Sequence, residues 1–424
     1  MIENNVPEVE YYLRSFLLFT KLFEKLDYSP PTKVRHHSSL QTPEQLQELF
    51  AYFFQFGAAA ERYVNNDTFF EELWKNANSI KGRQWFLGGN ALSMAQRLVQ
   101  EGAEVLLGMS HSKKLRALLP PEVKVAGPNL VTDDIHLILE YNKGDNWGSF
   151  TSPRANRLIL HSDNSNPQLE ALENFQEQLD SFQPSLLVLG GLQMMDNFPY
   201  EPGERTGRLN KVQEMLSSLP RKTKVHFEFA SFTDMDLLHE IMAKVIIYAD
   251  SIGLNEQELP NLVTLLNDGS VTVVSDSYPR IATVLDQMRF VYSHLQNSSE
   301  LEGRRRLTRL HVHTIAFQAI LTDKSSTWKN SMSATAKAAL TAHRHVCGSA
   351  DIDTLKARIL MDDSFSTSKL KSAQRIPLQK NRPVSCWDED RFQICIAPVL
   401  VCTKVQQTAG GGDNISSAGL VLQV

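Results

Sequence analysis

Short apolar segments alternate with longer amphipathic segments along most of the chain after about residue 85. The apolar segments are rich in leucine and β-branched residues, as buried parallel strands are, and the segments between them have helical periodicity. The predicted strands are 104–108, 186–189, 224–229, 244–248, 272–275, 309–313 and 392–402, and the predicted helices are 91–100, 168–179, 234–241 and 282–295. The alternation predicts an α/β fold with a mainly parallel central sheet covered by crossover helices.

Two segments have a different pattern. In 134–141 (DIHLILEY) and 156–161 (NRLILH) the alternation of residues is typical of half-exposed antiparallel strands. We therefore predict a small second sheet there. Residues 1–45 are predicted to form helix and polar loop, without a strand.

Charge excludes one class of partner. The 424 residues include 43 Lys and Arg against 48 Asp and Glu, a formal net charge of -5, so the chain lacks the basic field that nucleic-acid binding needs. Its apolar runs are shorter than the ~20 residues that cross a bilayer, and charges interrupt the opening segment. These patterns predict no membrane span and no secretion signal, hence a cytoplasmic location for the chain as given.

The four cysteines, Cys347, Cys386, Cys395 and Cys402, have no C-x-x-C spacing. They are too sparse for a disulfide scaffold or an all-cysteine zinc site. We expect them to pack in the core.

A glycine run gives the strongest local signal. The motif TAGGGDN, residues 408–414, follows a predicted strand and precedes a helix-like tail. Such a turn brings backbone N–H groups close to an anion, which the helix dipole also favours. Asp413 could then accept a proton from an attacking hydroxyl. The alternative is a tight turn with Asp413 as the helix N-cap.

Two acidic motifs, VHFEFAS (225–231) and SIGLNEQEL (251–259), stand at the ends of strands, which share one crevice in a parallel sheet. His226 and Glu228 share a strand face, and Asn255 and Glu258 share a face of a starting helix. Their oxygens suit Mg²⁺, directly or through water. Alternatively, Glu228 pairs with a neighbouring base and Glu258 is a favourable charge in a first helical turn.

Other polar groups are weaker candidates. His311 and His313 share a strand face and could bind a metal or lie in the core or a nucleotide pocket. Upstream, GAAAER (57–62) and FLGGNA (86–91) place small residues beside Glu61 and Asn90, which can hydrogen-bond a polyol. Asn90 could equally be a helix N-cap.

Five motifs, taken in their order along the chain, resemble the ADP-dependent glucokinase family, a branch of the ribokinase-like sugar kinases: GAAAE, GGNA, HFEFAS, GLNEQE and GGGD. The segment DIHLILEY resembles the animal members of that family. The resemblance implies a three-layer α/β/α fold with a small β lid. It implies a lid of residues 46–64 and 128–164, and a nucleotide-binding domain of residues 65–127 and 165–424. Animal relatives are associated with the endoplasmic reticulum or secreted.

The resemblance also implies that ADP transfers its terminal phosphoryl group to the 6-hydroxyl of D-glucose, with Mg²⁺, giving glucose 6-phosphate and AMP. Independently of the resemblance, we expect a monomer. The implied roles are Asp413 as base; Gly410, Gly411 and Gly412 as anion hole; Glu228 and Glu258 for Mg²⁺; Asn255 and His313 for the nucleotide; and Glu61, Gly89, Asn90 and Arg157 for the sugar.

One departure from the family keeps alternatives open. Relatives begin with a strand whose Asn and Asp side chains hold the sugar, and no such segment is found before Leu40. A catalytically impaired nucleotide-binding member is therefore one alternative. An ADP-dependent phosphofructokinase is another, although the acidic residues Asp133, Asp134 and Glu140 disfavour a second phosphate on the sugar.

Overall fold

A computed structural model describes residues 15–81, 87–131, 133–267, 269–271, 276, 278–296 and 303–424. The chain forms two compact units. Unit 1 consists of Met1–Leu92 and Leu106–Gln178, and unit 2 of Ser93–Val105 and Leu179–Val424. The unit boundaries fall within or beside α4 (Asn90–Gln100), β3 (Val105–Gly108) and α6 (Leu172–Phe182).

Unit 1 contains a four-stranded sheet in the order β1-β5-β8-β2. Its strands are β1 (Ser15–Leu18), β2 (Ala60–Tyr63), β5 (His136–Tyr141) and β8 (Asn156–His161). The central pair β5 and β8 is antiparallel, with His136 opposite His161, and the outer pairings are parallel. The prediction of a small sheet with antiparallel strands from 134–141 and 156–161 is confirmed, but the strands are mostly buried and not half-exposed as their pattern indicated.

The prediction that residues 1–45 hold only helix and polar loop is wrong at β1. Ser15–Leu18 pairs in parallel with β5, and an apolar tetrapeptide of this length gives too little periodicity to distinguish strand from helix. Helix α1 (Phe19–Lys25) follows directly. The sequence of β1, SFLL, contains neither Asn nor Asp.

Aromatic side chains form the core of unit 1. Phe19 and Phe23 of α1 contact Phe50, which lies on α2 (Pro43–Phe56), and the indole of Trp147 packs against the same rings. Thr42 caps α2 by accepting from the Gln45 N–H. The other elements of this unit are α3 (Asp67–Asn78), α5 (Lys113–Leu118), β4 (Val123–Ala126), β6 (Asn146–Trp147) and β7 (Phe150–Thr151).

Unit 2 contains a seven-stranded sheet in the order β17-β18-β13-β12-β11-β10-β9. Its strands are β9 (Leu186–Leu189), β10 (Lys224–Glu228), β11 (Ser251–Asn255), β12 (Arg309–His313), β13 (Phe317–Asp323), β17 (Ser385–Asp388) and β18 (Phe392–Pro398). Strands β9 to β12 are parallel, and β13, β18 and β17 continue as antiparallel neighbours. The predicted α/β class with parallel strands is confirmed.

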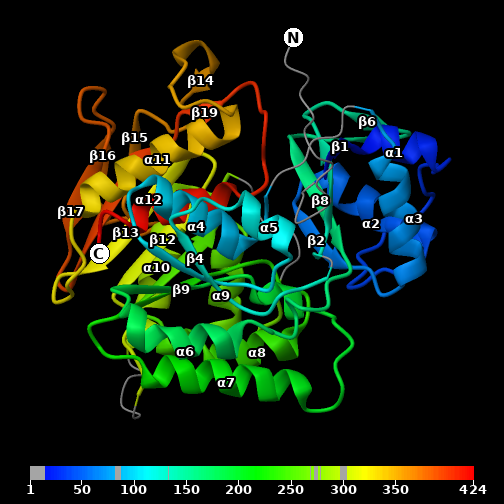
Figure 1. The fold of residues 1–424 in the computed structure, drawn as a ribbon. Helices are drawn as coiled ribbons and strands as arrows, with labels where there is room; N and C mark the ends of the chain where they lie inside the picture. Colours follow the sequence, from blue (N-terminus) through cyan, green and yellow to red (C-terminus); the bar gives the residue numbers. More distant parts are fainter. Residues whose placement is uncertain are drawn as a thin grey trace, which may run out of the picture. The chain divides into compact units, whose positions relative to one another are not determined.

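The helices of unit 2 are α7 (Glu204–Ser218), α8 (Met235–Lys244), α9 (Glu258–Leu266), α10 (Ile281–Gln296), α11 (Ser331–Cys347) and α12 (Gly411–Leu420). Helices α11 and α12 lie side by side on one side of the sheet, and α7 and α8 lie on the other (Figure 1). Unit 2 also contains the short strands β14 (Ala357–Arg358), β15 (Ser364–Ser366), β16 (Arg375–Pro377) and β19 (Val401–Cys402). Among the described helices, none is long and apolar enough to cross a membrane.

Two predicted strands differ from the structure. The segment 244–248 is the end of α8 followed by a 3-10 helix, Ile246–Tyr248, and the strand begins later, at Ser251. A short buried apolar run fits a helical turn as well as a strand, so periodicity could not separate them. The segment 104–108 forms β3, which pairs with β4 instead of joining the large sheet. The predicted strand 272–275 lies outside the described residues.

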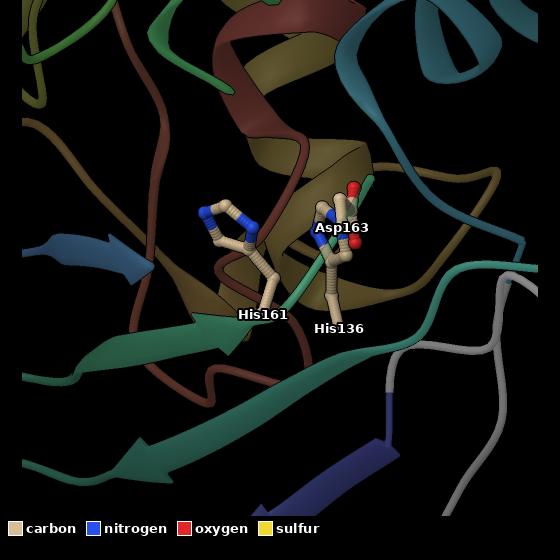
Figure 2. Close-up of side chains that lie close together, drawn as sticks. All are labelled: His136, His161 and Asp163. Carbon is tan, nitrogen blue, oxygen red and sulfur yellow. The ribbon is translucent and has the colours of Figure 1, made fainter. Parts of the chain in front are cut away.

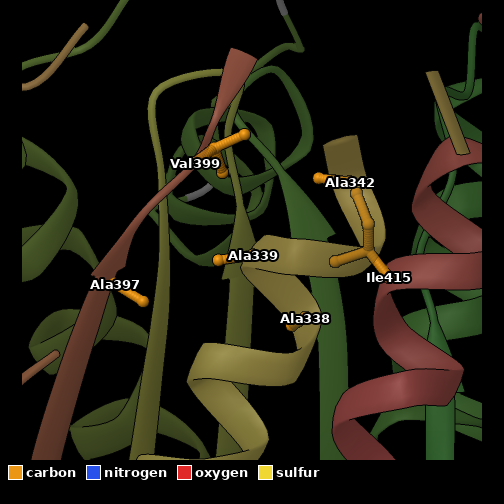
Figure 3. Packing of buried hydrophobic residues seen from close by; sticks show 6 residues of the cluster. All are labelled: Ala338, Ala339, Ala342, Ala397, Val399 and Ile415. Atoms are coloured by element: carbon orange, nitrogen blue, oxygen red, sulfur yellow. The ribbon is translucent and has the colours of Figure 1, made fainter. Parts of the chain in front are cut away.

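Small side chains allow α11 and α12 to pack closely on the sheet. The buried cluster in Figure 3 joins three alanines of α11 to Ala397 of β18, to Val399 just beyond that strand and to Ile415 of α12; the alanines are Ala338, Ala339 and Ala342. Because alanine extends little beyond the backbone, the helices can approach the strands closely. This packing fixes the beginning of α12, where the glycine run lies.

Cys347, Cys395 and Cys402 are buried, as predicted, but all four cysteines are also paired in disulfides, which the sequence did not indicate. Cys347 of α11 is bonded to Cys402 of β19, and Cys386 of β17 to its register partner Cys395 of β18. Partners 55 residues apart cannot be recognised from spacing, because folding alone brings them together. Disulfides are typical of proteins that fold in oxidising compartments.

We expect the Cys347–Cys402 disulfide to stabilise the chain more than the Cys386–Cys395 disulfide. The partners are 55 and 9 residues apart, and a longer closed loop restricts the unfolded chain more. Chain-entropy arguments give about 4 and about 2.5 kcal/mol. Urea unfolding of the Cys347→Ala/Cys402→Ala and Cys386→Ala/Cys395→Ala double variants measures both losses. An equal or larger loss for the shorter loop would contradict this ranking.

Candidate functional site

The glycine run forms the N-terminus of α12, in unit 2. Gly410 has φ 73°, in the left-handed region, and helix α12 begins at Gly411. A Cβ on Gly412 would lie 2.9 Å from Cε1 of His313, so only glycine fits there without displacing the imidazole. The side chain of Asp413 is buried in the first turn. The first N–H groups of a helix have no partners within the helix and can bind an anion.

Side chains from two other helices hold this turn. Arg97 of α4 donates from Nε to Oδ1 of Asn414 at 3.0 Å, and Asn414 Nδ2 donates to the Gly410 carbonyl at 2.9 Å. His345 of α11 donates from Nε2 to the Ala409 carbonyl at 2.8 Å. The turn is thus fixed on both sides of the glycines.

Glu228, at the carboxyl end of β10, lies under α12. Its carboxylate accepts hydrogen bonds from His226 Nε2 at 2.9 Å, His313 Nε2 at 3.1 Å and Ser416 Oγ at 2.9 Å. Burial alone would raise the pKa of Glu228, but the hydrogen bonds from the histidines lower it below its ordinary value. The alternative interpretation, in which Glu228 pairs with a neighbouring basic side chain, therefore agrees with its contacts to His226 and His313.

Glycine is also required next to this carboxylate. A Cβ on Gly253 of the neighbouring strand β11 would lie 2.1 Å from Oε2 of Glu228. A carboxylate has about four lone-pair positions, and three donors already contact Glu228. One position remains for a water molecule, so Glu228 suits a metal ion through water better than by direct contact.

Asn255 and Glu258 form a closed pair at the next strand end. Asn255 ends β11 and donates from its backbone N and from Nδ2 to the Glu258 carboxylate, at 2.8 and 2.7 Å. In return, Oδ1 of Asn255 accepts from the Glu258 N–H, the first residue of α9. Burial, with the nearby charge of Glu228, raises the pKa of Glu258 to about 8. A bound cation would favour its ionised form.

The structure adds residues that the motifs did not indicate. Arg309 is fully buried in β12 and donates to Gln423 Oε1 at 2.7 Å and to Ser251 Oγ at 3.0 Å. Ser251 Oγ in turn lies 2.8 Å from Nδ1 of His226. The sequence gives no local signal for this network, because the partners of Arg309 come from segments 114 and 58 residues away in the chain.

The predicted sugar residues lie in unit 1. Glu61 is on β2, with Oε1 at 3.5 Å from Nδ1 of His136, and Arg157 is on β8, opposite Glu140. Gly89 has φ +96°, and Asn90 begins α4. The loop before Glu61 is held by Arg154 Nε and Asn156 Nδ2, which donate to the Gly57 carbonyl at 2.6 and 2.9 Å.

Beside Glu61 lies a buried cluster that the motifs did not indicate: His136, His161 and Asp163 (Figure 2). His136 Nε2 donates to Asp163 Oδ2 at 2.8 Å. Burial would raise the pKa of Asp163, but His136 lowers it, while burial lowers the pKa of His161. Burial and the charge of Asp163 raise the pKa of Asp134 to about 8.

Unit 2 thus brings together the predicted base, anion hole, metal and nucleotide residues: Asp413, Gly410, Gly411, Gly412, Glu228, Glu258, Asn255 and His313. Unit 1 carries the predicted sugar residues. The arrangement in unit 2 combines a glycine-rich helix N-terminus with carboxylates at the ends of parallel strands, as expected of an α/β phosphotransferase.

Comparison with known proteins agrees with this class. The family model described as ADP-specific Phosphofructokinase/Glucokinase conserved region matches residues 15–422. An ADP-dependent glucokinase of Bos taurus is 34% identical over 405 residues, covering 94% of this chain and 80% of the relative. A probable ADP-dependent glucokinase of Caenorhabditis elegans is 28% identical, covering 91% of this chain and 78% of the relative.

Solved structures agree on the fold. A phosphofructokinase from Pyrococcus horikoshii, solved with AMP, has a TM-score of 0.61 at 18% identity and covers 97% of this chain and 94% of its own. An ADP-dependent kinase in complex with fructose-6-phosphate and ADPbetaS has a TM-score of 0.68 at 17% identity, covering 98% and 92%. The chain belongs to the ADP-specific phosphofructokinase/glucokinase family, as its motifs predict.

We expect Ser416→Ala to destabilise the chain by about 1.5–3 kcal/mol, because it removes a hydrogen bond to a buried charged group. Ser417 provides the matched control, since its buried Oγ has no hydrogen-bond partner among the described residues. Ser417→Ala should change the free energy of unfolding by less than about 0.5 kcal/mol or raise it. Urea unfolding compares the two, and equal losses would contradict the role of Ser416.

Proposed function

We propose that this protein is an ADP-dependent glucokinase, which transfers the terminal phosphoryl group of ADP to the 6-hydroxyl of D-glucose. The observation that carries the proposal is the buried Asp413 in the first turn of α12, directly after the glycine run. Support also comes from the relatives in Bos taurus and Caenorhabditis elegans, which bear this activity in their names.

In the proposed reaction, the N–H groups of Gly410, Gly411 and Gly412 accommodate the phosphoryl group. They point along the axis of α12, whose positive end favours the charge that develops during transfer. Asp413, placed beside them, accepts the proton of the 6-hydroxyl as its oxygen attacks phosphorus. The products are glucose 6-phosphate and AMP.

Magnesium fits the oxygen-rich donor set of this unit. Glu258 would hold the ion and Glu228 would bind one of its waters, because three hydrogen bonds already occupy most of the Glu228 carboxylate. When bound, Mg²⁺ would neutralise charge on the phosphates. Asn255 keeps the Glu258 carboxylate in place, and His313, between Glu228 and Gly412, would position the nucleotide end of the site.

The sugar would be held by Glu61, Gly89, Asn90 and Arg157, with residues 46–64 and 128–164 as a lid and 65–127 and 165–424 as the nucleotide-binding domain. A carboxylate such as Glu61 accepts hydrogen bonds from two hydroxyls of a sugar. Glucose suits this unit better than fructose 6-phosphate, because acidic residues such as Asp133 and Glu140 would repel a second phosphate.

We expect Asp413→Asn to lower kcat by about 10²- to 10⁴-fold, because the amide cannot accept the proton. Glucose 6-phosphate formation with Mg²⁺ and either ADP or ATP measures turnover, and calorimetry measures ADP binding, which should persist. Asp236→Asn, an exposed acidic residue in the first turn of α8, is the control. Turnover that survives in Asp413→Asn would rule out Asp413 as the base.

A second prediction concerns the sugar. Glu61→Gln should raise KM for glucose about 10- to 100-fold with a smaller change in kcat, because a hydrogen bond to a charged group is worth about 1.5–3 kcal/mol. Glu71→Gln, on the exposed face of α3 in the same unit, is the matched control. Steady-state kinetics with varied glucose separate the two constants. An unchanged KM in Glu61→Gln would remove Glu61 from the sugar site.

A further inference from the structure

The cluster in unit 1 consists of two imidazoles and one carboxylate. His136 of β5 and His161 of β8 are direct cross-strand partners, so their side chains stand on the same face of the sheet. Their ring centroids are 5.2 Å apart. Asp163 lies two residues beyond the end of β8, and one ligand atom from each residue lies within 4.8 Å of the others (Figure 2).

Part of this cluster is polar, buried and unsatisfied. His161 is 2% exposed and Asp163 is 1% exposed. Nδ1 of His161 and Oδ1 of Asp163 have no hydrogen-bond partner among the described residues. Figure 2 shows a ring nitrogen of His161 on the side of His136 and Asp163. Buried polar atoms normally have partners, so this arrangement points to a bound species.

The ligand types decide which species. Two neutral imidazoles and one carboxylate match the three protein ligands of many open zinc sites, whereas Mg²⁺ prefers oxygen ligands. We propose that His136, His161 and Asp163 bind a late first-row divalent metal ion of the Zn²⁺ type, with a water molecule as fourth ligand. All three ligands belong to unit 1, and none of them is among the carboxylates assigned to Mg²⁺ in unit 2.

The geometry needs only a small adjustment. In a tetrahedral zinc site the ion lies about 2.0–2.1 Å from each nitrogen or oxygen, so ligand atoms are about 3.3–3.5 Å apart. The three ligand atoms here lie within 4.8 Å of one another, so movements of about 1 Å bring them into place. The ion would replace the proton that His136 Nε2 shares with Asp163 Oδ2, now 2.8 Å apart.

Supporting partners surround these ligands. The other nitrogen of His136, Nδ1, faces Oε1 of Glu61 at 3.5 Å, and Asn166 Nδ2 donates to Asp163 Oδ2 at 2.7 Å. A carboxylate on the second nitrogen of a metal-binding histidine fixes its tautomer and orientation. Metal binding at Nε2 would keep the proton of His136 on Nδ1, directed at Glu61.

This contact gives the site a regulatory consequence, which rests on the proposed function. If Glu61 holds the sugar, a metal-bound His136 occupies one of its lone pairs with a permanent N–H donor. Bound Zn²⁺ is therefore expected to raise KM for glucose several-fold while leaving kcat nearly unchanged.

The test is a titration of the purified full-length chain with Co²⁺ in excess Mg²⁺, followed by visible absorption. Tetrahedral Co²⁺ bound to histidine absorbs strongly in the visible range, whereas hexahydrated Co²⁺ absorbs weakly. We expect one equivalent to bind, displaceable by Zn²⁺. His161→Ala and Asp163→Asn should weaken binding more than the 10- to 100-fold typical of losing a supporting partner.

His239→Ala removes an exposed imidazole from α8 in the other unit and should leave the spectrum unchanged. Because His161→Ala could unfold the sheet, His161→Asn keeps a polar group there, and circular dichroism monitors the fold. Weak octahedral absorption only, or an intact signal in a folded His161 variant, overturns the metal site. A metal signal without a change in KM overturns the coupling to Glu61 alone. The absorption spectrum does not depend on catalytic activity. Absence of turnover both with and without bound metal would therefore contradict the proposed function and not the metal site.

Discussion

The structure of unit 2 depends on keeping one buried carboxylate ionised. Glu228 is only 4% exposed, so the donors around it must replace most of its hydration. Arg309 donates to Ser251 Oγ, which leaves the serine hydrogen for Nδ1 of His226, and the single proton of His226 then points from Nε2 to Glu228. These successive hydrogen bonds from β12 through β11 to β10 thus fix one tautomer of His226. Ser416 adds a donor from α12.

That constraint extends to the reactive groups. Ser416 lies one turn after Asp413 on α12, so the hydrogen bond that neutralises Glu228 also fixes the rotation of the helix that carries the proposed base. His313 bonds the same carboxylate and leaves space only for a glycine at position 412. Ser416 and His313 therefore stabilise the buried charge of Glu228 and also shape the proposed anion site at the start of α12.

The sequence predicts most of this fold, because short runs rich in leucine and β-branched residues, such as Leu186–Leu189, alternate with longer segments of helical periodicity. Local motifs also single out Glu228, Glu258 and Asp413 as candidate site residues, which all lie in unit 2. The sequence could not predict the Cys347–Cys402 disulfide or the Arg309 network, since their members are far apart in the chain. It also missed the Cys386–Cys395 disulfide and the histidine cluster, whose members become neighbours only through the pairing of adjacent strands. Apolar runs such as 244–248 fail for another reason: burial without periodicity fits helix and strand alike.

The buried carboxylates of the two candidate sites differ in how far the protein satisfies their surroundings. In unit 2 both carboxylate oxygens of Glu228 and both of Glu258 accept hydrogen bonds from the protein, so these carboxylates are held in place before any ligand arrives. In unit 1 the His136–Asp163 pair is satisfied, but His161 Nδ1 and Asp163 Oδ1 are not. Preorganised carboxylates favour electrostatic work on a phosphoryl group. Unsatisfied buried donors and acceptors favour capture of a species that completes them, so each unit is suited to a different partner.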